Sequence, residues 1–112
     1  MTTSLDATAD QNVTEPVISI TDEARQIVID ALAAEPDPES MALWLEVRAI
    51  EAGNFVYDLY FQARTDAGDD DAVWTLDGLT TVVPARSVPR LTGAKLEFSN
   101  EGEGGLVIVN PN

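Results

Sequence analysis

The sequence contains neither cysteine nor histidine, and lysine occurs once in its 112 residues. These absences exclude disulfides, thiolate or imidazole ligands for a soft metal, cysteine nucleophiles and serine triads that rely on histidine. The lack of cysteine also fits a reducing compartment. We therefore predict a protein that is not an enzyme and holds no cofactor, and an enzyme built only on carboxylates, hydroxyls, Arg or Lys is the weakest alternative.

Basic residues and long apolar runs are scarce as well. Five arginines and one lysine stand against twenty acidic residues, which gives a formal charge of −14. Nucleic acids and anionic membranes need a basic footprint, and these six cations are scattered. No apolar run approaches the roughly 20 residues that span a bilayer, and the N-terminus lacks the features of a signal peptide. We expect a cytoplasmic protein that binds neither nucleic acid nor membrane, with solubility or a cationic partner as the use of its acidity.

Composition divides the chain into two regions. Residues 1–15 are polar and acidic, which predicts a disordered tail. Residues 16–112 carry the patterned segments and form one small domain. Their pattern predicts an α+β fold with mixed or antiparallel sheets of short strands, one main helix after the first strand and a short second helix. The expected strands are 17–20, 43–48, 55–62, 72–76, 79–83, 95–98 and 106–109.

Local signals set the helix and turns. Thr21 is a helix N-cap followed by acidic residues, and Pro36 comes after the helix has ended. Helical spacing predicts a buried stripe of Ala24, Ile27, Val28, Ala31 and Leu32. Asp77-Gly78 predicts a tight hairpin, and residues 85–91 predict the short second helix.

The hairpin from Leu43 to Gln62 is the centre of the prediction. Its first strand alternates, so that one face is buried and the other, with Trp44, points outward. Tyr60 falls on the same outer face of the return strand. The turn 49–54 includes Gly53-Asn54, which tolerate positive φ. Outward aromatics are enriched at interfaces, with burial as the alternative for Trp44 and Tyr60.

Other motifs predict little chemistry. The acidic loop around Asp66, Asp69, Asp70 and Asp71 lacks the spacing of an EF-hand and is interpreted as solvated. The glycine-rich stretch 102–105 leads into a strand rather than a helix, so it is a connection and not a phosphate loop. Glu46, Glu51 and Asp58 are not marked by any pocket. Arg86 and Arg90 either face solvent or bind an acidic partner.

Several segments in register carry a resemblance. They are Ile18-Ser19-Ile20-Thr21-Asp22-Glu23-Ala24, Leu43-x-Leu45-x-Val47-Arg48, Tyr57-x-Leu59-x-Phe61, Leu96-Glu97-Phe98 and Asn110-Pro111-Asn112. From Val17 to Asn112 the chain resembles the HesB-like (IscA-like, A-type) iron–sulfur cluster carriers. In that family three cysteines hold the iron or cluster, one in the central turn and a Cys-Gly-Cys pair after the Asn-Pro-Asn. Here Ala52 stands at the first position, and the sequence stops at Asn112 before the pair.

The resemblance therefore implies a degenerate, cysteine-free member. It is similar to the N-terminal domain of Nfu-type (NfuA) carriers, in which such a domain recognises client apoproteins. The resemblance predicts a protein-interaction or adaptor domain of iron–sulfur cluster biogenesis that docks to carriers or client apoproteins. The alternative is a structural or self-associating domain without an iron–sulfur role, which would form a homo-oligomer. The expected interface consists of Trp44, Glu51, Ala52, Gly53, Asn54 and Tyr60.

Overall fold

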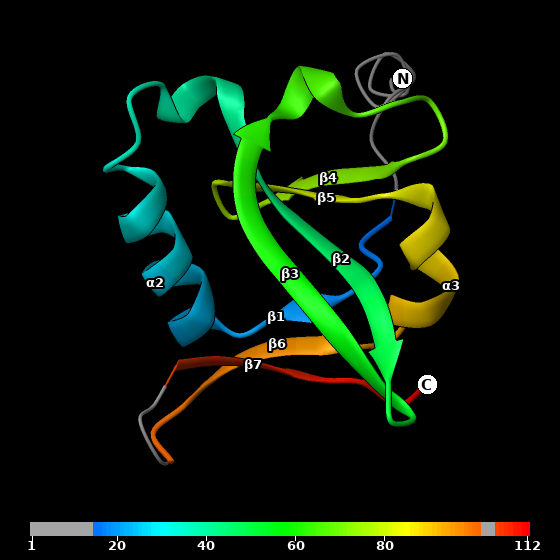
Figure 1. The fold of residues 1–112 in the computed structure, drawn as a ribbon. Coiled ribbons are helices and arrows are strands. Elements are labelled where there is room, and N and C mark those ends of the chain that lie inside the picture. Colours follow the sequence, from blue (N-terminus) through cyan, green and yellow to red (C-terminus); the bar gives the residue numbers. More distant parts are fainter. Residues whose placement is uncertain (1–14, 102–104) are drawn as a thin grey trace, which may run out of the picture.

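The computed structural model describes residues 15–101 and 105–112, so the predicted tail and most of the glycine-rich connection lie outside the described residues. Two sheets and two helices surround one main core (Figure 1). This confirms the α+β prediction, with a main helix after the first strand and a short second helix. In the part of the chain that the structure describes, no helix is long and apolar enough to cross a membrane.

The main helix, α2 (Asp22–Leu32), begins at the predicted cap. The Thr21 hydroxyl accepts a hydrogen bond from the backbone N–H of Ala24 at 3.2 Å, which satisfies one of the free donors of the first turn. The predicted stripe was too wide. Val28 is buried, as are Ala24 and Leu32 one turn to either side, but Ile27 is 37% exposed. The small domain covers only the i, i+4 row of this helix.

Four strands form the larger sheet, in the order β3-β2-β5-β4. Its strands are β2 (Met41–Glu51), β3 (Asn54–Ala63), β4 (Ala72–Leu76) and β5 (Leu79–Val83). Both hairpins are antiparallel, and β2 joins them by pairing in parallel with β5. The sheet is therefore mixed, with β3 and β4 at its edges.

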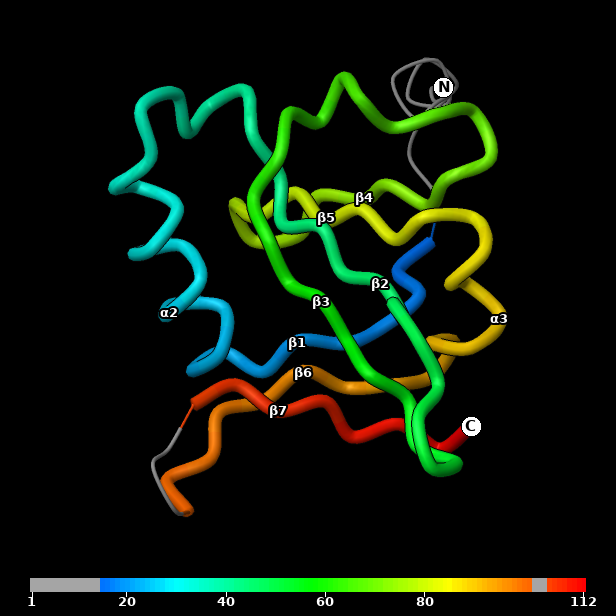
Figure 2. The backbone as a smooth tube through the Cα atoms, in the orientation of Figure 1, coloured from blue at the N-terminus to red at the C-terminus, as the bar shows by residue number. Residues whose placement is uncertain are grey.

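The smaller sheet unites the two ends of the described chain. Its order is β1-β6-β7, from β1 (Ser19–Ile20), β6 (Lys95–Ser99) and β7 (Gly105–Val109). Strand β1 is shorter than predicted and pairs in parallel with β6, Ser19 opposite Lys95. Figure 2 shows this blue segment beside the orange and red ones.

Short helical segments make the connections. They are η1 (Pro38–Ser40), η2 (Arg64–Asp66), η3 (Ala85–Ser87) and α3 (Val88–Leu91). The core lies between the two sheets and α2, and its most deeply buried large side chains include Leu45, Leu79, Leu91 and Leu96. The core-side face of the β2–β3 hairpin thus packs on the main core, and a second, smaller cluster of Ala42, Trp44 and Val82 covers part of its outer face.

Candidate protein-interaction surface

The tip of the β2–β3 hairpin is a two-residue turn. Glu51 pairs with Asn54, and the residues between them have positive φ, 51° at Ala52 and 82° at Gly53. The prediction assigned this conformation to Gly53-Asn54, whereas Asn54 already belongs to the strand. The turn is of the type in which both central residues are left-handed, which matches the twist of the strands. Ala52 adopts this conformation without the freedom of glycine, at a cost of order 1 kcal/mol. All four residues, Glu51 to Asn54, are exposed.

A β-bulge in β2 sets the direction of this tip. The register shifts between Val47 and Ala49, so that Arg48 is the extra residue and points outward. The backbone N–H of Val47 donates to the buried hydroxyl of Ser87 at 3.0 Å. Because of the inserted residue, Ile50 is paired with Phe55 instead of turning to the outer face.

Trp44 is buried, which corrects the expectation that it is an exposed contact. Only 5% of it is accessible. Its ring stacks on Tyr60 with centroids 6.1 Å apart, and its indole N–H donates to the carbonyl oxygen of Gln62 at 3.2 Å. A second small cluster forms on this outer face, and the loop after β3 contributes Ala67 to it. Alternation along a strand identifies two faces but not whether a distant loop covers one of them.

Ion pairs occupy the rest of the outer face. Arg86 donates to Glu46 at 2.7 Å, and Arg48 lies 3.7 Å from Asp58. Arg86 therefore has an acidic partner within the chain itself. The sequence reasoning treated these charges as separate, and the pairing arises because η3 packs beside β2. The arrangement favours a solvated polar face rather than an acid–base pair.

Tyr60 has a pKa raised above its ordinary value of 10.0, first by desolvation and second by the negative charge of Glu46. The folded state therefore keeps the phenolic proton to higher pH than the unfolded state. Stronger binding of this proton stabilises the folded state relative to the unfolded state. The stabilisation is complete below the unfolded pKa of about 10 and is lost as pH rises through the folded pKa.

A Tyr57→Phe variant leaves Tyr60 as the sole tyrosine. We expect its phenolate absorbance to appear at a higher pH in the folded protein than in the urea-unfolded chain. Adding Glu46→Gln should move the titration back toward pH 10 because one cause of the shift is removed. Coinciding folded and unfolded titrations would contradict this assignment.

The predicted interface residues do not form one patch. Glu51 is seven positions after Trp44 along β2, which is about 23 Å of strand. Tyr60, opposite Trp44, lies at the same remote end. The tip residues and Tyr60 therefore cannot contact one small ligand together, and the exposed part of the predicted interface is the tip.

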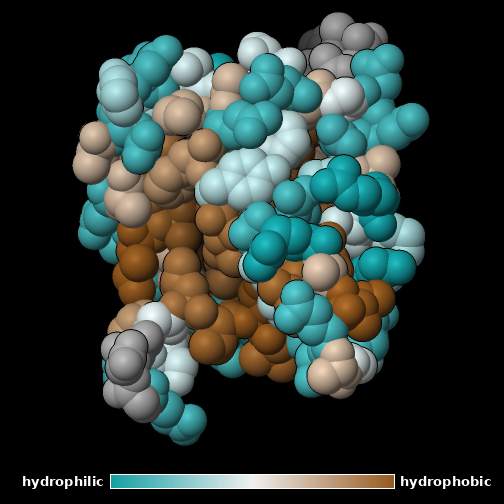
Figure 3. All heavy atoms as spheres, in the orientation of Figure 1, coloured by the Kyte–Doolittle hydropathy of each residue, from teal (hydrophilic) through white to brown (hydrophobic). Residues whose placement is uncertain are grey.

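The return strand carries a surface that the sequence reasoning missed. Its core-side residues are only half-buried and pack on the edge of the main core: Phe55, Tyr57, Leu59 and Phe61. Ile29 of α2 and Leu106 and Ile108 of β7 are half-buried apolar residues of the same core. In Figure 3 hydrophobic side chains gather between α2 and β3 and continue toward β7. The signal was present in four apolar residues at alternate positions, but alternation does not reveal that the strand is an edge.

The closing Asn-Pro-Asn segment returns to the central hairpin. The Asn110 amide donates to the hydroxyl of Tyr57 at 3.0 Å and to the carbonyl oxygen of Arg90 at 2.8 Å. The Asn112 amide donates to the carbonyl oxygen of Thr92 at 2.9 Å. These bonds fix residues 110–112 against α3 and β3, so the segment is anchored by its side chains.

The acidic loop is only partly free. Asp71 accepts from the backbone N–H of Gly68 and from that of Ala85, both at 2.8 Å, so it ties the loop to η3. Asp69 and Asp70 are exposed, as the prediction of a solvated loop expects. Within residues 15–101 and 105–112, no group of three acidic side chains is placed to hold a metal ion.

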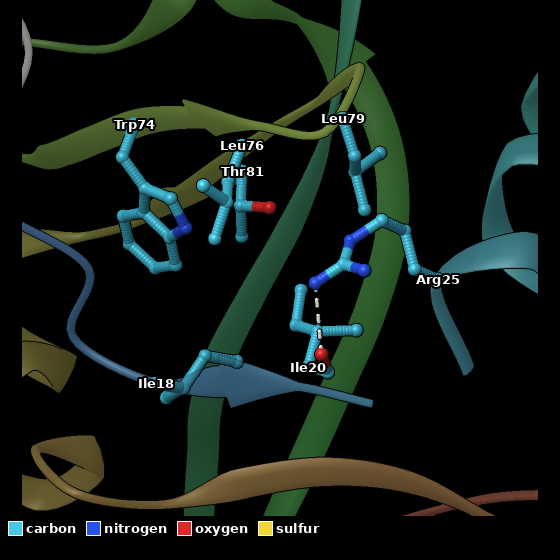
Figure 4. A pocket seen from close by; sticks show the side chains of 7 residues that line it. All are labelled: Ile18, Ile20, Arg25, Trp74, Leu76, Leu79 and Thr81. Carbon is cyan, nitrogen blue, oxygen red and sulfur yellow. Dashed lines mark hydrogen bonds between the residues drawn. The ribbon is translucent and has the colours of Figure 1, made fainter. Parts of the chain in front are cut away.

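A small cavity lies between β1, α2 and the second hairpin. Figure 4 shows the Arg25 guanidinium above the Ile20 carbonyl, to which it donates at 2.9 Å, with Trp74 and Thr81 on the opposite wall. Its volume of about 10 Å³ leaves room for about one water molecule. Among the described residues, the Thr81 hydroxyl is a buried polar group without a partner. The cavity is too small for a substrate.

We expect Thr81→Val to stabilise the protein by about 1 kcal/mol, because an unpaired buried hydroxyl is replaced by a methyl group of similar size. Urea denaturation gives the free energy of unfolding, and Thr80→Val, on an exposed hydroxyl pair, is the matched control. A loss of stability in Thr81→Val alone would mean that an ordered water satisfies the hydroxyl.

Relatives in sequence show the family of this chain. A protein named for iron–sulfur cluster insertion, ErpA of Delftia acidovorans, is 32% identical over 96 residues, which are 85% of this chain and 75% of that protein. The ErpA of Ralstonia nicotianae is 30% identical over 107 residues, 95% of this chain and 84% of the relative. The chain belongs to the A-type, HesB-like family of iron–sulfur cluster insertion proteins. No family model matches the sequence.

The solved structures agree on the fold. The crystal structure of Escherichia coli SufA, a protein of iron–sulfur cluster biosynthesis, has a TM-score of 0.68 at 23% identity, over 90% of this chain and 92% of that one. IscA with its [2Fe-2S] cluster has a TM-score of 0.66, also at 23% identity, over 85% and 83% of the two chains. The A-type fold is thus present in a sequence of 112 residues without cysteine, and its relatives act in iron–sulfur cluster biogenesis.

Proposed function

We propose that this A-type domain is a non-enzymatic interaction domain of cytoplasmic iron–sulfur cluster biogenesis. It docks to iron–sulfur carriers or client apoproteins and does not hold a cluster through thiolates of residues 1–112. The observation that carries the proposal is the presence of Ala52, and not a cysteine, at the central turn. It occupies the exposed tip of the central hairpin, where the family resemblance expects the first cysteine ligand. Carboxylate and carbonyl oxygens are poor substitutes for thiolate around such a cluster.

Two further features support a binding role. The tip is a two-residue turn whose exposed residues offer backbone and side-chain groups to a partner. The chain also carries a charge of −14, which steers encounters toward basic surfaces.

Anaerobic affinity capture from lysate of the source organism tests the proposal. The tagged domain serves as bait, a charge-matched acidic protein is the control, and co-purifying proteins are identified by mass spectrometry. We expect enrichment of iron–sulfur carriers or client apoproteins. If none is enriched above the control, the domain has kept the fold without the role.

A matched pair of variants locates the surface. Ala52→Arg changes the tip of the first hairpin, and Leu76→Arg places the same charge at the end of the second, where Leu76 is 49% exposed. Capture should be lost in the first variant and kept in the second. Trp44→Ala is unsuitable, because removal of a buried indole changes packing rather than a contact surface.

The alternative, a self-associating structural domain, is favoured by the open edge of β3. Sedimentation equilibrium over a range of concentrations separates it from the adaptor. A mass that doubles with concentration, with no iron–sulfur protein captured, supports the alternative.

A further inference from the structure

Strand β3 is an edge without the usual protection. Among the described residues it pairs only with β2. Its ten residues contain no proline, glycine or lysine, and Asp58 is their one carboxylate. Nine of the ten are half-buried and Asn54 is exposed, so neither face is covered completely. Natural edge strands are usually short, charged, bulged or covered, because an open edge pairs readily with another strand. In the part of the chain that the structure describes, no strand pairs with the other side of β3.

The free backbone groups lie beside the apolar row. In a two-residue turn the N–H of the last residue faces the partner strand, which here places the N–H of Asn54 toward β2. Backbone groups alternate in direction along an antiparallel strand. Those of Phe55, Tyr57, Leu59 and Phe61 therefore face away from β2. An incoming strand would find hydrogen-bonding groups and half-buried apolar side chains at the same four residues.

Helix α2 and the segment that follows it carry carboxylates outside the ion pairs. Helix α2 stands on the side of β3 away from β2 (Figure 1). In the described chain, five carboxylates of this helix and of the segment that follows it form no ion pair: Glu23, Asp30, Glu35, Asp37 and Glu39. A segment that binds β3 would approach a molecule with a formal charge of −14, so Lys and Arg in that segment would be favoured.

We propose that the free edge of β3 binds an extended segment of a partner protein as an additional strand. The segment has apolar side chains at alternate positions, which cover the row of Phe55, Tyr57, Leu59 and Phe61, and it carries Lys or Arg. A second copy of this chain fits less well, because each copy brings a charge of −14. Backbone pairing supplies affinity and the side-chain row supplies selectivity. The surface is continuous with the hairpin tip of the proposed function.

Selection from a library tests the inference. Random peptides about as long as β3 are selected on the wild-type domain, and those that bind Leu59→Lys are removed. We expect the enriched peptides to alternate apolar residues and to contain Lys or Arg. Methylation of alternate backbone nitrogens in an enriched peptide should weaken its binding roughly tenfold or more, because a ladder of hydrogen bonds is lost.

The control variant introduces the same positive charge on the same strand, but on the opposite face of β3. Gln62→Lys adds the same side chain on the outer face of β3, and it should bind the selected peptides like the wild type. Circular dichroism and urea denaturation confirm that both variants are folded. The N-methylated peptides use the unmodified domain, so the test does not depend on the stability of Leu59→Lys.

Four results would overturn the inference: no peptide enriched over Leu59→Lys, acidic rather than basic peptides, equal binding after N-methylation, or a wild-type dimer that Leu59→Lys dissociates. The last result would assign the edge to a second copy. The inference rests on the proposed function for the identity of the natural partner. The peptide experiment uses no iron–sulfur protein, so its failure is distinguishable from failure of the affinity capture.

Discussion

Leu45→Ala is expected to destabilise the domain by about 3 kcal/mol. Leu45 is fully buried in the middle of β2, with 0% of its surface accessible. Its strand lies between β3 and β5, so the neighbouring backbones are held by pairing on both sides and cannot collapse into the space. Removal of three carbon atoms therefore costs both the burial of the side chain and the cavity that it leaves.

The consequence is large for a domain of this size. Single domains have free energies of unfolding of about 5–15 kcal/mol, so this change removes a substantial part of the total. It should lower the Tm by about 15 °C. Urea denaturation with an unchanged m-value would show that stability, and not the unfolded state, has changed.

Ile50→Ala on the same strand is the matched control. Ile50 is 50% exposed, so its truncation should cost less than about 1 kcal/mol. Equal losses in the two variants would mean that the tip of the hairpin is packed as tightly as its middle, in conflict with the burial described here.

Ser87→Ala is expected to cost about 2 kcal/mol, although only one oxygen atom is lost. Ser87 is 1% exposed, and its hydroxyl accepts the backbone N–H of Val47 at the bulge of β2. Without it, this buried N–H has no acceptor, and an unsatisfied buried donor costs more than an ordinary hydrogen bond contributes.

The experiment has a local readout as well as a global one. Hydrogen exchange of the Val47 amide should accelerate more than that of the core amides, because the bulge loses its anchor. Ser99→Ala, which removes a hydroxyl at an exposed hydrogen bond, is the control and should change stability by less than about 0.5 kcal/mol. An unchanged stability in Ser87→Ala would show that water replaces the hydroxyl.

The sequence predicts what local chemistry determines. The cap at Thr21 and the Asp77-Gly78 turn were predicted correctly, because each depends on a few neighbouring residues. The alternation of Leu43, Leu45 and Val47 correctly identified the buried face of β2. Long-range pairing was beyond this reasoning. The parallel pairing of β2 with β5 places Leu43 opposite Thr81, and no local pattern predicts that register.

The candidate site was predicted less completely for the same reason. The exposed hairpin tip follows from turn chemistry, and its displacement by one residue, from Gly53-Asn54 to Ala52-Gly53, is within the uncertainty of a turn boundary. The burial of Trp44 depends on a loop that contributes Ala67 to the outer face. The open edge of β3 depends on the strand order of the whole sheet. Both are tertiary facts that the alternation of one strand cannot contain.

The pairing of β1 with β6 has a consequence for synthesis on the ribosome. Ser19 finds its partner, Lys95, only after 75 intervening residues have been added, which takes several seconds at about 5–20 residues per second. During that time the β2–β3 hairpin can form, but the smaller sheet, which packs on the core-side face of the hairpin, is still incomplete. We therefore expect the nascent chain to expose Leu43, Leu45 and Val47 together with the edge of β3 until β6 has left the exit tunnel.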